Sequence, residues 1–463
     1  MRCLVGVDDT DSQLGSCTTH LGFRMVSRLL VRGCTFATYP RLVRLNPNVP
    51  FKTRGNAAVC LEFETDDPEG AFEIAEGAVR EMSDTENGAN SGLVFVDRPS
   101  AFDFRGLYLS AVSGLVSYRG TLARLAERGV RRATLGNGMG IVGAAASLGF
   151  REEDDDHTFE LIAYRTEASC GRERRVEAGS VKRMELATFP RTFNSFDHRT
   201  RRVLLTPHGP DPVFLGVRAD DPSVALSAFG MLRFEEELAG HVVYLSNQCT
   251  DAHLKQRLGE PLKAYSSGWL EGTVDALEKA EGGHLYLDLR VAGPPVRAAV
   301  YRPSADLRRA AELLERGDLV RVFGGVRRAT SRHPPILNVE KLEVLALSPL
   351  RRRANPLCPG CARVAKSEGR GKGFQCRRCG ARFGEDAVRT VARSRSLVPG
   401  VYLPPPGAQR HLTKPLVRYG RELHGKRSPL VDGWFWLGPS GASPAPDQSP
   451  LSGPRGPLSP RTP

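Results

Sequence analysis

The stretch CLVGVDDTD at residues 3–11 decides the fold expected for the first part of the chain. Its first five residues have the apolar character of a β-strand, and the strand runs into an acidic turn. GSCTT at 15–19 follows and opens a segment with apolar residues at helical spacing, namely Leu21, Met25, Leu29 and Leu30. A strand that passes through a polar turn into a helix, here at about 18–32, predicts α/β structure.

The α/β pattern extends to about residue 192. Strands are expected at 57–63 and 107–112, and a glycine-rich run at 136–143 leads into a further apolar segment. We therefore predict a first α/β domain over residues 1–192.

The next two blocks are smaller. Residues 193–262 have the order strand, strand, helix, strand, which suits a ferredoxin-like domain. Residues 263–347 hold five strand candidates with one helix between the third and the fourth, a pattern typical of an OB-fold β-barrel. An unrelated five-stranded barrel is the alternative. The whole chain is thus predicted to be an α+β multidomain protein.

Four cysteines late in the chain have the spacing of a zinc site. Two residues separate Cys358 from Cys361 and Cys376 from Cys379, and 14 residues lie between the two pairs. Each pair places two thiolates on one tight turn, and two such turns complete a tetrahedron. Four protein ligands leave no open position, so the Zn²⁺ of this predicted zinc ribbon, residues 353–390, is expected to be structural.

The positive charge is concentrated near the end of the chain. The formal net charge is +13, and residues 351–436 hold 19 Lys and Arg against 5 Asp and Glu, whereas residues 1–350 hold 44 against 46. A localised basic block predicts contact with a polyanion, and the alternative is a solvated basic surface. The candidate RNA-binding residues, from the ribbon and from a basic C-terminal segment at 391–436, are Arg377, Arg378, Arg410 and Lys414.

The last 27 residues, 437–463, hold 8 Pro, 5 Ser and 4 Gly. This composition cannot bury a core, so a disordered tail is expected.

Some locations are disfavoured by the sequence. No run of ~18 apolar residues is present, which argues against a membrane span. The acidic turn comes too early for a signal-peptide core, so a cytoplasmic location is expected. Six of the ten cysteines are scattered singly, which does not suit a disulfide framework.

The acidic turn and the helix after it suit a nucleotide–metal site. Asp8, Asp9 and Asp11 lie just past the end of a strand, where clustered carboxylates commonly hold Mg²⁺. Thr18 lies at the expected helix N-terminus, where backbone N–H groups favour anions. A solvated turn and an ordinary threonine cap are the alternative. No GxxxxGK[ST] motif is present, so a standard P-loop is not supported.

Two other stretches could contact a nucleotide, because cations neutralise phosphate and glycines allow close approach to it. The candidates, in a basic loop before a strand and in the glycine-rich run, are Lys52, Arg54, Gly55, Asn56, Gly138 and Gly140.

Polar, rigid residues gather at two strand ends of the middle block, TPHGPDPV at 206–213 and NQCTDAH at 247–253. Such segments commonly line pockets, although a packed or capping role is the alternative for their histidines. The candidate substrate-binding residues are His208, Asp211, Asn247 and Asp251.

Several motifs in a specific order resemble the archaeal tRNA-isoleucine 2-agmatinylcytidine synthetase (TiaS) family. They are GVDDTD at 6–11, CTT at 17–19, RGNA at 54–57, TPHGP at 206–210, NQ at 247–248, TDAH at 250–253, the four-cysteine ribbon and RHLTKP at 410–415. The resemblance covers about residues 3–420. Asp211 and Cys249 stand where the family pattern has a cysteine and a glycine.

The resemblance implies a kinase-like domain, a ferredoxin-like domain, an OB fold and a zinc ribbon. It implies a ligase that joins agmatine to carbon 2 of the wobble cytidine of tRNA-isoleucine (CAU anticodon), so that the tRNA reads AUA. The cytidine would first be phosphorylated, with ATP converted to AMP and two phosphates. Asp8, Asp9 and Asp11 would hold Mg²⁺, and Thr18 would accept phosphate.

The resemblance also implies contacts with the anticodon and acceptor regions of the tRNA. Agmatine is a dication, so its pocket is expected to be acidic, with Asp211 and Asp251 as candidates. The sequence does not indicate an oligomeric state.

Two other functions fit parts of the sequence. A non-enzymatic OB-fold and zinc-ribbon nucleic-acid-binding protein would account for residues 263–390, but not for the acidic strand end within residues 1–262. A different ATP-dependent tRNA-modifying ligase would use another amine, such as lysine.

Overall fold

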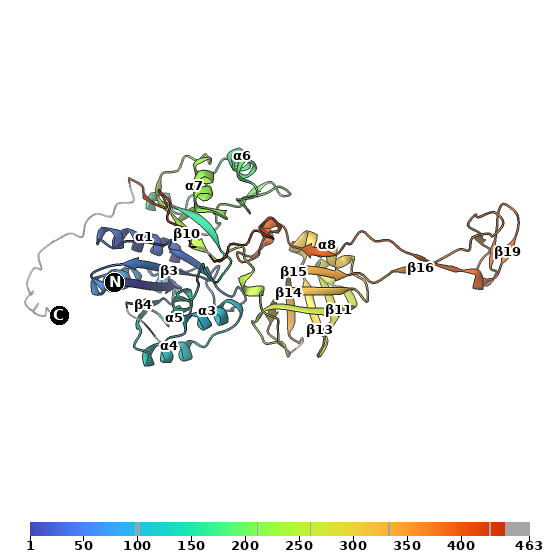
Figure 1. Cartoon of the computed structure of the whole chain (residues 1–463), viewed down its shortest axis with the longest axis horizontal. Helices are drawn as coiled ribbons and strands as arrows, with labels where there is room; N and C mark the ends of the chain where they lie inside the picture. The colour runs from blue at the N-terminus through green and yellow to red at the C-terminus, as the bar shows by residue number, and fades with distance from the viewer. Residues whose placement is uncertain are drawn as a thin grey trace, which may run out of the picture.

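The computed structural model describes residues 1–97, 100, 102–210, 212–259, 261–331, 334–425 and 427–439. Figure 1 shows an α/β body, a β-barrel beside it and a small cysteine-rich module at the far end of a narrow connection. No helix within these residues is long and apolar enough to cross a membrane.

The body is built on one mixed sheet. Within the described residues its main path has the order β5 (Arg131–Thr134), β4 (Gly92–Val96), β1 (Arg2–Asp8), β3 (Ala57–Glu64), β2 (Arg41–Arg44), β10 (Leu238–Ser246), β6 (Thr158–Arg165) and β9 (Val213–Ala219). A ninth strand, β22 (Phe435–Leu437), pairs with β10 beside this path. Only the pairing of β2 with β10 is parallel among these strands.

Helices cover both faces of the sheet. Successive side chains of β1 point to opposite faces, and apolar residues occur on both. Cys3, Val5 and Val7 are buried in one core, together with residues of α1 (Thr18–Val31) and α2 (Pro68–Met82). The opposite core contains residues of α3 (Phe104–Ser113), α4 (Tyr118–Glu127), α5 (Ile141–Ser147), α6 (Ala178–Thr188) and α7 (Pro222–Gly230). The sequence CLVGV therefore supplies one apolar face to each side.

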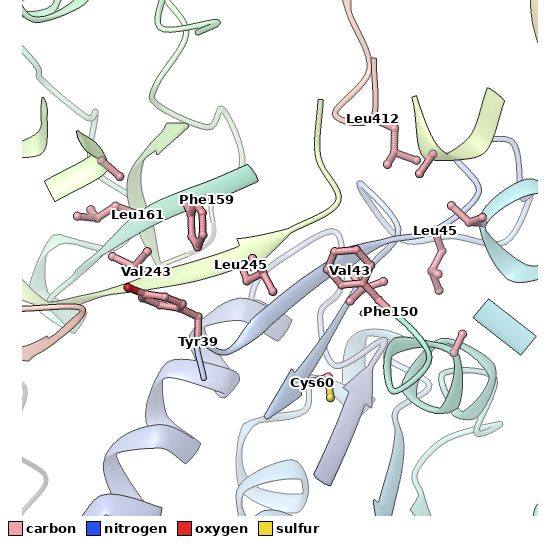
Figure 2. Packing of buried hydrophobic residues seen from close by; sticks show 14 of the residues in the cluster. Tyr39, Val43, Leu45, Cys60, Phe150, Phe159, Leu161, Val243, Leu245 and Leu412 are labelled. Atoms are coloured by element: carbon pink, nitrogen blue, oxygen red, sulfur yellow. The ribbon is translucent and has the colours of Figure 1, made fainter. Parts of the chain in front are cut away.

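Figure 2 shows part of the second core, where side chains of β2, β6 and β10 lie together. Leu412 belongs to the same buried cluster although it lies far along the chain. The C-terminal segment is therefore part of the folded body.

The prediction of a strand at 107–112 is wrong, because these residues lie in the helix α3. Asp103 caps this helix by accepting a hydrogen bond from the backbone N–H of Gly106. Its buried side chains, which include Leu107, Tyr108, Ala111 and Val112, follow helical spacing. The helix expected at 18–32 is confirmed as α1, and the strand expected at 57–63 is confirmed as β3.

The sheet continues across the boundary expected at residue 192. Strand β6 precedes that position, yet it pairs with β9 and β10, which follow it. The order predicted for 193–262 is present as β8 (Arg202–Val203), β9, α7 and β10, and β8 forms a two-stranded ribbon with β7 (Phe196–Asp197). Both predicted blocks therefore contribute strands to one sheet.

The five strands predicted within 263–347 are confirmed as a closed barrel. They are β11 (Ser267–Lys279), β12 (Leu285–Arg290), β13 (Val296–Val300), β14 (Leu319–Arg327) and β15 (Ile336–Ala346), with α8 (Ala305–Glu312) between the third and the fourth. A parallel pairing of β13 with β15 closes the barrel. Strand β21 (Gly400–Tyr402) pairs with Leu342–Val344 of β15, further along the edge that pairs with β13.

The cysteine-rich module is inserted between β15 and β21. Its stalk is the antiparallel pair β16 (Arg351–Ala354) and β20 (Arg389–Ala392). Its tip is a three-stranded sheet of β17 (Lys366–Ser367), β18 (Phe374–Gln375) and β19 (Arg382–Phe383). A long, thin connection thus separates the module from the barrel (Figure 1).

After β21 the chain returns to the body, where its described part ends two residues after β22 (Figure 1). Leu437 pairs with Gly240, and the N–H of Gly438 donates to the carbonyl of Ala239. The first residues of the predicted tail are therefore held at the sheet, and the rest of that prediction, from residue 440 on, lies outside the described residues.

Candidate active site

A cavity of about 570 Å³ opens where the acidic turn, the basic loop and the C-terminal segment meet. It brings together predicted site residues from separate parts of the chain. Those that line it are Asp8, Asp9, Asp11, Thr18, Lys52, Arg54, Gly55, Asn56, Gly140, His208 and Arg410.

Asp8 is held at the end of β1 in a tight, charged position. Its carboxylate accepts a hydrogen bond of 2.8 Å from the backbone N–H of Asp9. Burial first, and then the charges of Asp9 and Asp11, raise the pKa of Asp8 well above its usual value. Burial also raises the pKa of Asp9, whose carboxylate accepts a 2.8 Å hydrogen bond from Oγ1 of Thr53. These crowded carboxylates favour a cation.

Thr18 is the first residue of α1, and Cys17 occupies the N-cap position. The Thr18 hydroxyl accepts a 3.0 Å hydrogen bond from Oγ1 of Thr10 and lies 3.5 Å from Oδ1 of Asp11, to which it donates. Arg54 holds Asp11 from the other side, with 3.4 Å between Nε and Oδ2. Thr18 therefore points its hydroxyl into the acidic turn and does not cap the helix.

The basic loop is shaped by contacts of its own. The Asn56 amide donates a 2.8 Å hydrogen bond to the carbonyl of Asn46. Gly55 lies against two larger side chains, since a Cβ atom there would be 2.5 Å from Nη1 of Arg44 and 3.3 Å from Cδ2 of His411. A side chain at Gly55 would displace both.

Four charged or histidine residues that line the cavity are not among the candidate site residues predicted from the sequence: Arg44, Glu160, Arg218 and His411. Nε of Arg218 is 3.1 Å from Oε1 of Glu160, and Nη2 of Arg218 is 3.2 Å from Nδ1 of His411. The Gln248 amide donates to the other carboxylate oxygen of Glu160. A carboxylate within the otherwise apolar, buried run FELIA at 159–163 of β6 was the signal that could have found Glu160.

Other predicted residues do not line the cavity. Asn247 is buried and bonds both backbone groups of Arg44, at 2.7 and 2.8 Å. Asp251 is buried and pairs with Nζ of Lys341 at 2.5 Å. Gly138 lies in the turn before α5 with a φ of +70°. Asp211 lies outside the described residues.

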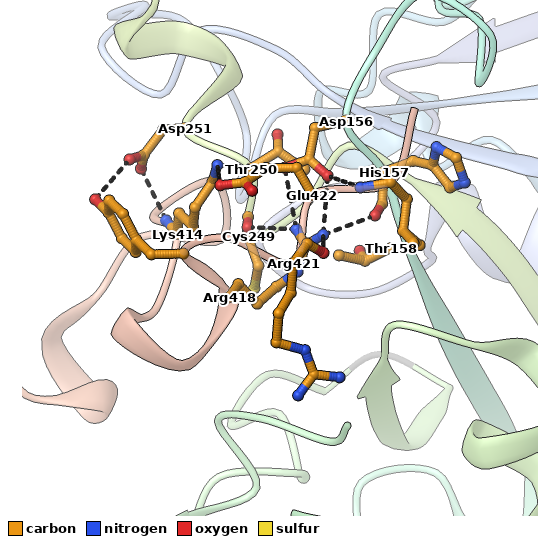
Figure 3. Close-up of polar contacts among 12 residues, drawn as sticks. Asp156, His157, Thr158, Cys249, Thr250, Asp251, Lys414, Arg418, Arg421 and Glu422 are labelled. Carbon is orange, nitrogen blue, oxygen red and sulfur yellow. Dashed lines mark hydrogen bonds and ion pairs between the residues drawn. The ribbon is translucent and has the colours of Figure 1, made fainter. Parts of the chain in front are cut away.

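The C-terminal segment is anchored by a buried ion pair (Figure 3). Arg418, 1% exposed, donates to the Asp156 carboxylate at 2.9 Å and to the carbonyls of Cys249 and His157 at 2.9 and 3.1 Å. Lys414 lies 3.5 Å from the same Asp156 and 2.9 Å from Glu422. This anchoring positions the preceding residues of the segment at the cavity.

Cys249 links that anchor to the cavity. Its N–H donates a 2.8 Å hydrogen bond to the carbonyl of His411, and its φ is +57°. This left-handed conformation favours glycine, which explains the glycine of the family pattern at this position.

The four cysteines form a metal site in the ribbon. The sulfur atoms of Cys358, Cys361, Cys376 and Cys379 all lie within 4.8 Å of one another, as four ligands of a tetrahedral Zn²⁺ require. Arg377 and Arg378 are exposed on the same module, where Arg377 lies 3.5 Å from Glu368.

Three family models match the chain. They are the TiaS TCKD domain at residues 4–67, the TiaS FLD domain at 138–253 and the TiaS C-terminal zinc ribbon domain at 355–394. The isoleucine-tRNA 2-agmatinylcytidine synthetase TiaS of Cenarchaeum symbiosum (strain A) is 41% identical over 440 residues, covering 94% of this chain and 96% of the relative. The protein of the same name from Methanopyrus kandleri is also 41% identical, covering 89% and 96%.

Solved structures agree with these relatives. The crystal structure of apo TiaS, an agmatidine synthetase for isoleucine tRNA, matches with a TM-score of 0.81 at 32% identity, covering 90% of this chain and 98% of that chain. The complex of TiaS with isoleucine tRNA, AMPCPP and agmatine matches with a TM-score of 0.77 at 31% identity, covering 90% and 97%. These matches confirm the resemblance carried by the sequence motifs, and the chain belongs to the TiaS family.

Proposed function

We propose that the chain joins agmatine to carbon 2 of the wobble cytidine of tRNA-isoleucine and uses ATP to do so. The observation that carries this proposal is the cavity, in which the acidic turn and Thr18 face the basic residues Lys52 and Arg54. The relatives are named 2-agmatinylcytidine synthetases of isoleucine tRNA, and one solved relative holds that tRNA, AMPCPP and agmatine together.

The cytidine must first be activated, because the carbonyl oxygen on its carbon 2 is a poor leaving group. Oxygen 2 of the cytidine attacks the γ-phosphorus of ATP, and the bond from that phosphorus to its bridging oxygen breaks, so that ADP leaves. Transfer of the β-phosphoryl group of this ADP to water would give the expected AMP and the second phosphate. The primary amine of agmatine then adds to carbon 2 and loses a proton, and oxygen 2 departs as phosphate. For such transfers the protein supplies mainly position and charge neutralisation.

Thr18 is proposed as a phosphoacceptor within this site. Its hydroxyl lies 3.5 Å from Asp11, which is in place to take the hydroxyl proton. Arg54 orients Asp11 from the other side. The adjacent helix N-terminus adds a favourable field for phosphate.

The acidic turn fits Mg²⁺. The aspartates do not form a complete cage, since the only group of three or more clustered metal ligands among the described residues is the four cysteines. Mg²⁺ needs no such cage, because one or two carboxylates with water and substrate phosphates usually suffice. Asp8 and Asp9 would hold the ion, with Asp11 nearby, and when bound it would neutralise phosphate charge.

Of the other residues predicted to bind ATP or agmatine, some are proposed to contact these ligands and others to support the cavity wall. Lys52 is proposed to neutralise phosphate, while Gly55, Asn56 and Gly140 shape the cavity wall. His208 and Val213 line the cavity, which supports an agmatine pocket at this loop. Asn247, Asp251 and Gly138 are proposed to support the site from outside the cavity, because the first two are held by protein partners.

We further propose that the barrel is an OB fold, which the single helix between its third and fourth strands supports. Residues 1–192 are proposed as a kinase-like domain and 193–262 as a ferredoxin-like domain, with a cytoplasmic setting given by the tRNA substrate. Arg377 and Arg378 are proposed to contact tRNA phosphates. Arg410 lies 3.0 Å from Glu340 and Lys414 is paired, so both are proposed to position the segment at the RNA path.

The test is mass spectrometry of the anticodon fragment of tRNA-isoleucine after incubation with the protein, ATP and agmatine. A mass gain equal to agmatine minus water at the wobble cytidine is expected, and it should vanish without ATP. A gain with lysine in place of agmatine would identify a different ligase. Tight tRNA binding with no mass gain would favour the non-enzymatic binding protein.

A further inference from the structure

His411 lies on the cavity wall with one ring nitrogen already engaged. Its Nδ1 is 3.2 Å from Nη2 of Arg218. A guanidinium has only N–H donors, so this Nδ1 accepts and carries no proton. A neutral imidazole whose Nδ1 accepts must carry its proton on Nε2. The side chain therefore offers the cavity a hydrogen-bond donor.

Neighbouring cations keep the ring neutral. The charge of Arg44, then burial, then the charge of Arg218 lower the pKa of His411 well below its usual value. Arg218 is itself fixed, because its Nε bonds Glu160 at 3.1 Å. Protonation of His411 would create a third positive charge among these groups, so the neutral donor is the stable form.

The backbone holds the ring in place. The carbonyl of His411 accepts from the N–H of Cys249, whose own carbonyl accepts from the buried Arg418. Leu412, the next residue, is buried in the body core. On the cavity side the ring lies against Gly55, where a Cβ atom would be 3.4 Å from Nε2.

The three proposed substrates are ATP, agmatine and the wobble cytidine, and their hydrogen-bonding groups decide what the Nε2–H of His411 can bind. Agmatine presents an ammonium and a guanidinium, which both donate, so it has nothing to accept from Nε2–H. Phosphate is better served by Lys52 and Arg54, which are charged. A ring nitrogen of a nucleobase remains. Nitrogen 3 of cytosine accepts a hydrogen bond, whereas nitrogen 3 of uracil donates one.

We propose that His411 is a positioning residue that donates from Nε2–H to nitrogen 3 of the flipped wobble cytosine and thereby distinguishes cytidine from uridine. The proposal rests on the proposed function. When the amine adds to carbon 2 of the phosphorylated base, electron density moves onto nitrogen 3. A donor already placed there stabilises that density without reorganisation.

Three substitutions separate the donor from the ring. The Gln side-chain nitrogen reaches the place of Nε2, the Asn nitrogen reaches only that of Nδ1, and Phe keeps the ring without a donor. His411→Gln should keep single-turnover agmatinylcytidine formation within about fivefold of wild type. His411→Asn and His411→Phe should lose at least tenfold. His198→Phe is the matched control, because His198 is exposed and does not line the cavity.

A binding experiment tests the base directly. Dissociation constants are measured for tRNA-isoleucine transcripts with cytidine or uridine at the wobble position, in the presence of a non-hydrolysable ATP analogue. Wild type should prefer cytidine, and His411→Phe should bind the two transcripts equally. Thermal melts confirm that each variant is folded.

The results of these experiments distinguish the proposed function from the role of His411. A wild-type enzyme that makes no agmatinylcytidine refutes the proposed function. If wild type is active, a wild-type rate in His411→Phe overturns the role of His411. A rise in the KM for ATP alone, with the cytidine preference kept, overturns it too and assigns the imidazole to the adenine ring.

Discussion

Gly143 and Asp8 lie so close that a Cβ atom on Gly143 would be 1.8 Å from a carboxylate oxygen of Asp8. The first turn of α5 thus packs directly against the acidic turn. Any side chain at this position would push Asp8 out of its place at the cavity.

Gly143→Ala is therefore expected to lower the single-turnover rate at least ~100-fold, equivalent to about 2.7 kcal/mol of transition-state stabilisation. Helix propensity alone would favour alanine there by about 1 kcal/mol. Gly77→Ala in α2 is the matched control, since nothing lies within 4 Å of a Cβ atom at that glycine. The control should be slightly more stable and fully active, and an active Gly143→Ala enzyme would contradict the placement of Asp8.

Thr18→Val should keep the fold and lose the chemistry. The substitution removes the hydroxyl that bonds Thr10 and faces Asp11, at a stability cost of about 1 kcal/mol. The rate of agmatinylcytidine formation should fall at least ~100-fold, which is more than that cost explains. Thr18→Ser should retain phosphate transfer. Unchanged tRNA affinity in parallel would separate the phosphate site from the RNA path.

Arg418→Met should destabilise the body by about 3–5 kcal/mol, because it leaves Asp156 buried without its partner. Arg427→Ala also removes an ion pair, with Glu153, but that pair is half exposed and should cost less than about 1 kcal/mol. Urea unfolding of both variants measures the difference. Equal losses would show that the C-terminal segment is not anchored by Arg418.

Acidification should weaken the fold through His20. Burial, helped by the charge of Arg24, lowers the pKa of His20 from 6.5 to about 4. The unfolded chain takes up this proton first, so stability is lost as the pH falls from 6.5 toward 4. The loss should be about 2–3 kcal/mol. His20→Phe keeps the contacts with Phe23 and Tyr164 and should unfold with a flatter pH dependence over this range.

Cys376→Ser should release zinc and unfold the ribbon while the body stays folded. One lost thiolate removes most of the metal affinity, and such modules fold on their metal. The stalk of β16 and β20 limits the damage to the module. Zinc content, tRNA affinity and the thermal melt of the body are the measurements. Full zinc content and full tRNA affinity in the variant would contradict a ribbon held by these four cysteines.

What the sequence predicted correctly is mostly local. The cysteine spacing and the acidic turn before α1 each lie within a short stretch, so pattern alone locates them. The partners of His411 are different, because Arg218 is 193 residues away and Glu160 is a further 58 from Arg218. The periodic spacing of apolar residues in a sequence does not indicate contacts between residues so far apart.

The error at 107–112 has another cause. The segment is apolar and lacks charged residues that would mark one face, so strand and helix patterns are hard to distinguish over six residues. The capping residue Asp103 fixes the start of the helix. Its role becomes clear only in the structure, where its carboxylate accepts a hydrogen bond from the backbone N–H of Gly106. Asn247 illustrates a similar limit, since its buried polar side chain bonds the backbone of Arg44 and does not line the cavity.

The return of the chain from the ribbon to the body sets the order in which the protein can become active during synthesis. His411, Arg418 and β22 all leave the ribosome after the zinc module. A nascent or prematurely terminated chain that ends after the ribbon therefore lacks the residues that the C-terminal segment adds to the cavity wall, His411 among them. If the ribbon contacts tRNA as proposed, such a chain is expected to bind tRNA without modifying it until the segment that carries His411 has been made and folded onto the body.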